Sequence, residues 1–327
     1  MSEDPAADTL APDRAGNVLV IGSINIDTIF SVDRLPEPGA TRIAHDVKEA
    51  LGGKGQSQAI AAARFGSATR LAGAVGTDAA GEMARQELGA SGVDIGLVRT
   101  STRPTGRAVV CVDSSAENSI VVSRGANEDL HTLRDVDREA IASADVLLTQ
   151  LEAGVDIAFE AILLAHQKGT RVVLNAAPAS PIPEEVLRCV DFFIVNRVEI
   201  LEFGETPDID QCAAALSRSV GSVLVTLGSE GGRLYHKDEP VLQLQGLTIE
   251  PVDTTGSGDT VCGVFAASLA QSLSVPDAFQ LALVAGSLAA LKHGNAPSIP
   301  TRAEVDAKCR IPPASRSVSE RFPIGAP

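Results

Sequence analysis

Short apolar runs alternate with stretches of helical periodicity along most of the chain, and this alternation restricts the fold more than any other feature. The apolar runs include TRLAGAVG, DVLLTQLE, TRVVLNAAP, DFFIVN and SVLVTLG, and each lies beside a helical pattern such as VDIAFEAILLAHQKG. Alternating strands and helices are typical of parallel crossover connections, which place helices on both faces of one sheet. We therefore predict an α/β protein, a three-layer α/β/α sandwich with a mostly parallel central sheet, whose ligands bind beyond the carboxyl ends of the strands.

Two segments interrupt the alternation and predict a small additional sheet. Residues 106–124 have the pattern of a β-hairpin around a Ser-rich turn, and residues 28–51 follow the first apolar run, NVLVIGSINID, which is interpreted as one buried strand over 17–27. Such a sheet could form a lid beside the binding cleft. The predicted organisation is a disordered tail (1–16), an α/β domain (17–27, 52–105 and 125–312), a β lid (28–51 and 106–124) and a flexible C-terminal tail (313–327).

Composition excludes several classes of function. The net charge is −15, and aromatic residues make up only 3% of the chain, so binding to nucleic acid is not expected. The five cysteines are scattered without a C-x-x-C pair, which predicts neither a disulfide framework nor a zinc site and favours the cytoplasm. No run of 18 apolar residues occurs, and the first sixteen residues lack the pattern of a signal peptide, so we expect no membrane association.

Two glycine clusters could bind an anion. In DTTGSGDT a Gly-Ser-Gly turn lies between Asp253 and Asp259, ahead of an apolar helical run. The N–H groups of such a turn attract phosphate, which a carboxylate at Asp259 would repel; alternatively, Asp259 caps the helix and Asp253 is a turn residue. The second cluster, GGKGQSQ, carries Lys54, which is either directed at a phosphate or solvated on a flexible turn. Neither cluster matches the P-loop or the Rossmann signature.

Two strand ends carry paired polar residues. The stretch NRVE follows the strand FFIV, so Asn196 and Glu199 could approach a hydrated Mg²⁺, although Asn-x-x-Glu at a helix start is also close to a capping box. In SINID, Asn25 and Asp27 are expected at the end of the first strand, where alternation leaves both side chains on the same side. This pair suits polyol recognition, and the competing interpretation is an ordinary turn at a strand end.

The motifs SINID, GGKGQSQA, LLTQLE, NRVE, VTLGSEGG and DTTGSGDT occur in this order, and over about residues 17–312 the chain resembles the ribokinase-like (PfkB) family of sugar kinases. The resemblance implies transfer of the γ-phosphoryl of ATP to a sugar hydroxyl, foremost the 5-hydroxyl of D-ribose. It implies that Asp259 is the general base, which explains a carboxylate in this turn, and that the N–H groups of Gly256, Ser257 and Gly258 hold the developing phosphoryl charge.

The resemblance also implies ligands for the sugar, the nucleotide and two metal ions. The residues implied for the sugar are Asn25, Asp27, Gly53, Lys54, Ser57, Glu152 and Asp259. Those implied for ATP are Asn196, Thr226, Gly228 and Gly258, with Mg²⁺ near Asn196 and Glu199. Those implied for K⁺ are Asp253, Thr255, Ala289, Lys292, Gly294 and Ser298. A homodimer through the lid is also expected, because one lid face would be apolar and unpaired.

One departure from the family pattern concerns the sugar. The family usually reads GGKGANQA, whereas this chain has GGKGQSQA, with Ser57 in place of a sugar-contacting Asn and Gln56 in place of its Ala neighbour. For ribose to be the substrate, Ser57 must act through a bridging water or Gln56 must supply the missing amide. The alternatives are a kinase of the same family for another pentose, a ketohexose or a nucleoside, and a non-catalytic sugar-binding regulator. Retention of Asp259 and of NRVE disfavours the regulator.

Overall fold

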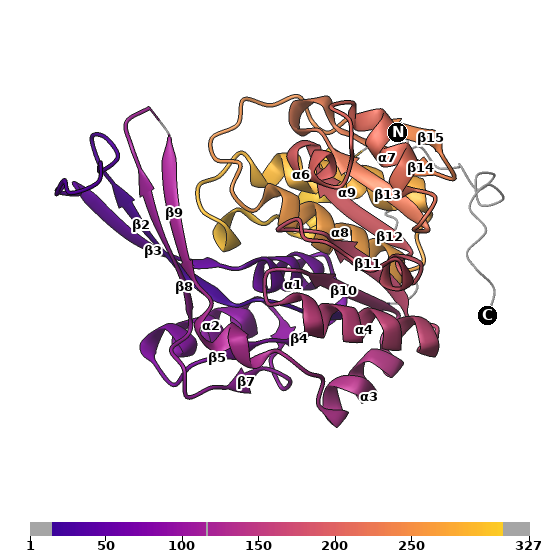
Figure 1. Cartoon of the computed structure of the whole chain (residues 1–327), viewed down its shortest axis with the longest axis horizontal. Coiled ribbons are helices and arrows are strands. Elements are labelled where there is room, and N and C mark those ends of the chain that lie inside the picture. Colours follow the sequence, from indigo (N-terminus) through magenta and orange to yellow (C-terminus); the bar gives the residue numbers. More distant parts are fainter. Residues whose placement is uncertain (1–14, 116, 310–327) are drawn as a thin grey trace, which may run out of the picture.

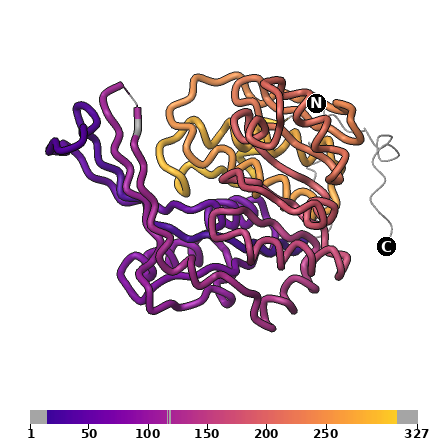
Figure 2. The backbone as a smooth tube through the Cα atoms, viewed as in Figure 1, coloured from indigo at the N-terminus to yellow at the C-terminus, as the bar shows by residue number. Residues whose placement is uncertain are grey.

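The computed structural model describes residues 15–115 and 117–309. The predicted tails at 1–16 and 313–327 lie outside the described residues, apart from Ala15 and Gly16. Figures 1 and 2 show a large α/β body from which a smaller sheet projects at one side. Among the described residues, no helix is both long and apolar enough to cross a lipid bilayer.

The centre of the body is a mostly parallel sheet. Its nine described strands run in the order β15-β14-β13-β12-β11-β10-β1-β4-β6, parallel from β6 to β13 and antiparallel at β14 and β15. The strands are β1 (Asn17–Ile21), β4 (Ala68–Ala72), β6 (Val93–Asp94), β10 (Val146–Gln150), β11 (Arg171–Asn175), β12 (Phe192–Asn196), β13 (Ser222–Thr226), β14 (Gly232–His236) and β15 (Glu239–Leu244). The predicted fold class is confirmed.

Helices cover both faces of this sheet, because alternate residues of its buried strands point to opposite sides. Val18 and Val20 of β1 pack in one apolar cluster, and Leu19 and Ile21 pack in the other. The first cluster includes residues of α1 (Lys54–Arg64), α2 (Ala79–Ala90), α8 (Ser257–Ala270), α9 (Val275–Ala289) and α10 (Arg302–Lys308). The second includes residues of α3 (Asp135–Ser143), α4 (Val155–Lys168), α5 (Glu184–Leu187), α6 (Arg197–Glu202) and α7 (Ile209–Leu216).

The projecting sheet has four strands in the order β3-β2-β8-β9. They are β2 (Asn25–Ser31), β3 (Asp46–Gly52), β8 (Gly106–Val112) and β9 (Asn118–Ser123), and β8 and β9 form the predicted hairpin. The remaining short elements are β5 (Ala74–Val75), paired with β7 (Arg99–Thr100), and the 3₁₀ turns η1 (Gly125–Asp129), η2 (Gly228–Glu230) and η3 (Ala296–Ser298). We refer to the four-stranded sheet as the lid sheet.

The prediction of one strand over 17–27 is wrong. The chain leaves the central sheet after Ile21 and enters the lid sheet at Asn25, so Asn25 and Asp27 begin β2 and do not end β1. Gly22 lies at the break, and a Cβ there would lie 2.0 Å from Gln150 Oε1 and 2.8 Å from Gly55 Cα. The close approach of these neighbours requires glycine at the point where the chain changes sheets.

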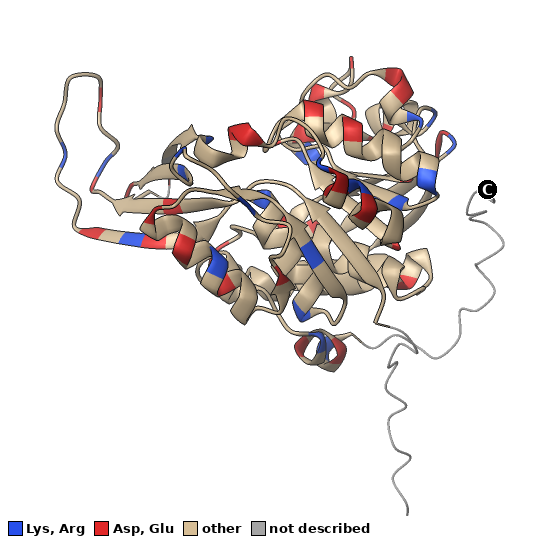
Figure 3. Cartoon of the chain, turned by 90° about the horizontal axis from the view of Figure 1, so that it is seen from below, with Lys and Arg blue, Asp and Glu red and all other residues tan. Residues whose placement is uncertain are grey.

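Charged residues are distributed over the surface without segregation by sign in the view of Figure 3. Acidic and basic residues are interleaved along the helices and the lid sheet of that view. With a net charge of −15, such a surface does not favour polyanions, so a small anionic ligand must depend on local donors in the site.

Candidate active site

Helix α8 begins inside the Gly-Ser-Gly turn. Gly256 is its N-cap residue in the left-handed conformation (φ 75°), which glycine adopts at little cost. The N–H of Ser257 donates to the carbonyl of Thr254 at 3.2 Å, whereas the N–H of Gly258, in the first turn, has no acceptor within the helix. Asp259 lies in this turn, and the cap has no side-chain hydrogen bond. The alternative interpretation of Asp259 as a helix cap is therefore wrong.

Buried amides hold the Asp259 carboxylate. Gln58 Nε2 donates to Asp259 Oδ1 at 2.9 Å and to Asn175 Oδ1 at 3.1 Å, and Gln58 Oε1 accepts from Gln150 Nε2 at 2.6 Å. Both protons and the oxygen of the Gln58 amide are thus engaged, which fixes its orientation. Asp259 consequently has one oxygen held by a defined donor.

Lys54 lies among carboxylates from α8, from α6 and from the loop after β10. The negative charge of Asp259 is the main reason that the pKa of Lys54 is raised above its usual range; burial opposes this effect, and Glu152 and Glu199 add to it. Burial in turn raises the pKa of Asp259, against the opposing effects of Lys54 and the Gln58 hydrogen bond. The structure thus brings together four residues that the sequence places far apart.

Glu152 connects the loop before β2 to the start of α1. Ser23 Oγ and the backbone N–H of Lys54 both donate to Glu152 Oε2, the latter at 2.8 Å. Gly53 is the N-cap residue of α1 (φ 86°). The predicted sugar residues Gly53, Lys54 and Glu152 therefore lie next to one another.

Asn25 is buried, and Asn127, which no sequence motif indicates, orients its side chain. Asn127 Nδ2 donates to Asn25 Oδ1 at 2.8 Å, and Asn127 Oδ1 accepts from the N–H of Ile24 at 3.0 Å. Because the oxygen of Asn25 is engaged, its amide nitrogen is the group best placed to serve a ligand as a donor.

Asp27, two residues along the same strand, has an unusual acidity. Burial, and next the charge of Glu152, raise the pKa of Asp27 to about 6. A desolvated carboxylate next to another carboxylate is costly for folding and is typical of functional sites.

The Asp27→Asn variant tests this cost. Because the folded-state pKa is raised, ionisation of Asp27 destabilises the fold, and the loss develops as the pH rises through about 6. We expect the melting temperature of Asp27→Asn, relative to that of the unmodified protein, to increase between pH 5 and pH 8. Asp78 is the control because the hydrogen bonds of Thr105 and Gly81 outweigh its burial and lower its pKa. The melting temperature of Asp78→Asn, relative to that of the unmodified protein, should not change over this range.

The same pH dependence of the relative melting temperature in both variants would contradict a raised pKa of Asp27.

The NRVE stretch forms a capping box in the structure. Asn196 Oδ1 accepts from the N–H groups of Val198 and Glu199, both at 2.8 Å, and Glu199 Oε2 accepts from the N–H of Asn196 at 2.8 Å. Burial raises the pKa of Glu199, and the charge of Asp259 adds to this effect while that of Lys54 opposes it. Glu199 therefore faces the predicted catalytic residues, and Asn196 pairs in register with Thr226, which precedes Gly228 at the start of η2.

These groups fit a hydrated Mg²⁺ better than a direct protein cage. The oxygen of Asn196 already accepts two hydrogen bonds, and no cluster of three or more His, Cys, Asp or Glu with metal-binding geometry occurs in residues 15–115 and 117–309. Mg²⁺ commonly keeps several waters and takes one or two carboxylates together with substrate phosphates. Glu199 can serve such an ion.

The segment at Asp253 is tied to the loop at 292–298. Asp253 Oδ1 accepts from the N–H of Thr255 at 2.9 Å, and its Oδ2 accepts from the N–H of Gly294 at 3.0 Å. Burial raises the pKa of Asp253, but these hydrogen bonds outweigh it and hold the pKa below the usual range. A carboxylate with a lowered pKa thus lies beside the backbone of Thr255 and Gly294, two of the residues predicted for K⁺. Hard oxygen ligands such as a carboxylate suit that ion.

Several polar residues of the site were not identified from the sequence: Ser23, Gln58, Asn127, Gln150, Asn175 and Asn295. Gln58 lies inside the glycine cluster GGKGQSQ, four residues and thus about one helical turn after Lys54, and this spacing was a usable signal. Asn127 lies in the short 3₁₀ turn η1 and Asn295 directly precedes η3, and such short elements leave no periodic pattern that would indicate contacts.

The amino-acid sequence of the chain matches a known family and its members. The model of the pfkB family carbohydrate kinases matches residues 15–302. The chain belongs to this family. Among curated pfkB relatives, the ribokinase of Haemophilus influenzae is 35% identical over 296 residues, covering 87% of this chain and 95% of the relative. The ribokinase of Arabidopsis thaliana is 32% identical over 322 residues, covering 93% and 85%.

Solved pfkB structures have the same fold. The Arabidopsis thaliana ribokinase complexed with ribose and ATP superposes with a TM-score of 0.85 at 32% identity, covering 91% of this chain and all (100%) of that chain. The Thermotoga maritima ribokinase gives a TM-score of 0.82 at 29% identity, covering 89% and 98%. The predicted family and fold are confirmed.

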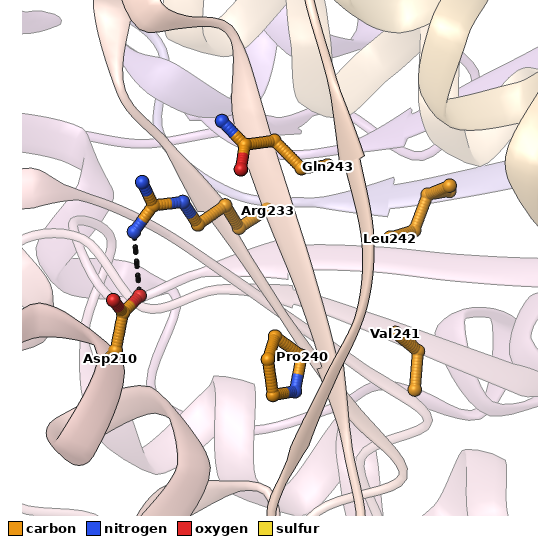
Figure 4. A pocket seen from close by; sticks show the side chains of 6 residues that line it. All are labelled: Asp210, Arg233, Pro240, Val241, Leu242 and Gln243. Atoms are coloured by element: carbon orange, nitrogen blue, oxygen red, sulfur yellow. Dashed lines mark hydrogen bonds and ion pairs between the residues drawn. The ribbon is translucent and has the colours of Figure 1, made fainter.

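A pocket of about 510 Å³ lies away from these residues, at the β15 edge of the central sheet. Its lining residues are Asp210, Arg233, Pro240, Val241, Leu242 and Gln243. Figure 4 shows Arg233 directed at Asp210, and the two side chains form an ion pair of 2.7 Å. Tyr235 also donates to Asp210. This pocket contains none of the predicted site residues, and its charges neutralise each other.

Proposed function

We propose that the chain is an ATP-dependent ribokinase, which transfers the γ-phosphoryl group of ATP to the 5-hydroxyl of D-ribose. One observation carries the proposal. Asp259, at the start of α8, lies close enough to Lys54 and Glu152, two of the predicted sugar-binding residues, for their charges to act on its pKa. The identity of 35% with a curated ribokinase supports ribose as the acceptor.

The chemistry assigned to Asp259 is general-base catalysis. Its carboxylate takes the proton of the sugar hydroxyl, whose oxygen attacks the γ-phosphorus, and ADP leaves. Asn25 and Asp27 hold other hydroxyls of the sugar, with Gly53, Lys54 and Glu152 on the neighbouring side. The N–H groups of Gly256 and Gly258 take up charge on the transferred group. The N–H of Ser257 contributes only after it releases the carbonyl of Thr254, to which it is bonded at 3.2 Å.

The nucleotide is assigned to the ends of β12 and β13. Asn196, Thr226 and Gly228 lie there, and Glu199 faces Lys54 across the site. Bound Mg²⁺ would neutralise phosphate charge. Glu199 would orient its water shell, and Lys54 would contact the phosphoryl group. All five cysteines are free thiols, which supports the cytoplasm as the location.

ADP release across a panel of sugars and nucleosides tests the proposed function. We expect the highest kcat/KM with D-ribose. A higher value with another pentose, a ketohexose or a nucleoside would make the chain a kinase of the same family with another acceptor, which the Ser57 departure favours. Sugar binding without ADP release from any compound would instead identify a non-catalytic regulator.

We further propose that K⁺ binds between Asp253 and the 292–298 loop. The proposed ligands are Asp253, Thr255, Ala289, Lys292, Gly294 and Ser298. The ion would fix the segment that leads into the glycine turn, so ADP release at constant Mg²⁺ should rise several-fold when K⁺ replaces Na⁺. The Asp253→Asn variant should lose this response. Equal rates in K⁺, in Na⁺ and without either cation would contradict the site.

We also propose that two chains form a homodimer through the lid sheet. The face that carries Asn25 and Asp27 continues along the strands into Ile29, Ala50, Ala108, Val110, Ile120 and Val122. Asp46 and Lys48 are the charged residues at the β3 edge of this face. The opposite face carries the ion pair of Glu49 with Arg107 beside the exposed side chains of Val47, Val109 and Val121. An apolar face of this size favours coverage by a second copy.

Two neighbouring residues of β9 test this dimer, because they point to opposite faces. Ile120 is 53% exposed on the apolar face, and Val121 is 69% exposed on the other. We expect Ile120→Asp to shift the mass measured by light scattering from dimer to monomer at micromolar concentration, whereas Val121→Asp should leave it unchanged. A fully active monomeric wild type would refute the dimer.

A further inference from the structure

The hydroxyl of Ser57 has a partner from a distant part of the chain. Ser57 Oγ donates to the carbonyl of Gly53 at 2.9 Å and accepts from Asn295 Nδ2 at 2.7 Å. A hydroxyl has a single proton, so its donation to Gly53 leaves Ser57 only as the acceptor for Asn295. This assignment fixes the Asn295 amide, with its nitrogen toward α1 and its oxygen directed elsewhere.

The oxygen of Asn295 is buried and has no hydrogen-bond partner among the described residues. The residue is 7% exposed. A Cβ built on Gly256 would lie 2.2 Å from Asn295 Oδ1, so this oxygen lies directly beside the glycine turn that opens α8. A buried acceptor without a donor costs free energy. Next to the glycine turn, a bound ligand that donates a hydrogen bond to this oxygen would remove that cost.

Gln56 offers a second buried amide, and its position is different. Its Nε2 donates to the carbonyls of Asn25 and Gly52, the former at 2.9 Å, and Gln56 is fully buried. Gln56 Oε1 also lacks a partner among the described residues. Gln56 therefore supports the backbone that carries Asn25, whereas Asn295 lies between the sugar-binding segment and the glycine turn.

We propose that Asn295 is a specificity-determining residue for the acceptor. It supplies, from the loop at 292–298, the amide that Ser57 lacks, and its Oδ1 accepts a hydrogen bond from a hydroxyl of the bound sugar. A sugar hydroxyl is the matching chemistry because it can donate a hydrogen bond to this buried oxygen. The inference rests on the proposed function, since it deepens the account of the same site.

The Asn295→Ala variant tests the contact. We expect the KM of the sugar to rise about tenfold, as for the loss of one buried hydrogen bond, with the KM of ATP unchanged. Calorimetry without nucleotide should show the same loss of sugar affinity. Gln271 is the matched control: it is a buried amide at the other end of α8 that donates to the carbonyl of Phe65. Gln271→Ala should lower the melting temperature but leave the KM of the sugar unchanged.

An amide placed on α1 at position 57 should compensate for the loss of the Asn295 amide. The double variant Ser57→Asn/Asn295→Ala should bring the KM of the sugar back to within about threefold of the wild-type value. Ser57→Asn alone should not improve binding, because the larger side chain would crowd Asn295. If Asn295→Ala does not fold, Ser57→Ala removes the group that orients Asn295 and should raise the KM of the sugar several-fold.

Deoxy analogues identify the hydroxyl. For the analogue that lacks it, Asn295→Ala should cause no additional loss of affinity, whereas the other analogues should lose about tenfold. An unchanged KM in Asn295→Ala, or an equal loss for every analogue, would overturn the inference. If the KM of the sugar rises in Gln56→Leu but not in Asn295→Ala, the sugar-binding amide belongs to Gln56.

All measurements use the sugar with the highest kcat/KM. An acceptor other than ribose would therefore refute the ribokinase assignment and leave the test of Asn295 intact.

Discussion

The Asp259→Asn variant is expected to lose about 10²–10⁴ in kcat, the usual contribution of a general base. The amide keeps the size of the side chain but does not take up the proton of the sugar hydroxyl. The fold should be retained, because the cap of α8 does not involve this side chain. Single-turnover measurement of phosphoryl transfer, together with the melting temperature and ATP affinity, checks the expectation.

Asp277 provides a matched control for the charge at a helix start. It lies at the third position of α9, as Asp259 does in α8. The backbone N–H of Asp277 donates to Oγ of Ser274, the N-cap residue of α9, at 3.3 Å. Asp277→Asn removes the same favourable interaction with a helix dipole. We expect a small change in stability and no change in kcat. Similar kcat values for the two variants would remove Asp259 from the chemistry.

Most of the fold could be predicted because buried parallel strands and amphipathic helices leave distinct patterns in the sequence. Val18 to Ile21 form such a strand, and α4 covers the predicted helical stretch. The error at 17–27 has a physical cause. Apolar residues continue through Ile24 and Ile26, both fully buried, so hydropathy does not reveal that the chain passes from one sheet into another. The break depends on the close packing of Gly22 against neighbours that are distant in the sequence.

The charged part of the candidate site could be predicted, because Lys54 and Asp259 lie in short motifs whose residue types indicate their chemistry. The buried amides could not. Gln58 and Asn295 read as ordinary polar residues of a helix and a loop, and only the fold decides which donor faces which acceptor. The interpretation of NRVE had two alternatives, and the capping box is what Asn196 forms. A magnesium role for Glu199 stays a prediction, supported by its position opposite Lys54.

The Lys54→Met variant is expected to have the second large effect, a loss of about 10²–10³ in kcat/KM, comparable to the loss of one donor in an oxyanion hole. Methionine keeps the apolar stem but removes the positive charge that lies among Asp259, Glu152 and Glu199. Lys168, exposed in the last turn of α4, is the control. Lys168→Met should retain the wild-type kcat/KM.

The pH profile separates the role of Lys54 in catalysis from a purely structural one. Lys54 lowers the pKa of Asp259, in opposition to burial, so its removal should raise that pKa. A base with a higher pKa is protonated over more of the acidic range, and the acid limb of kcat/KM should therefore move to higher pH in Lys54→Met. A uniform loss of activity with an unshifted acid limb would show that Lys54 does not act on Asp259. An unshifted limb with normal activity would also remove Lys54 from the phosphoryl-transfer site.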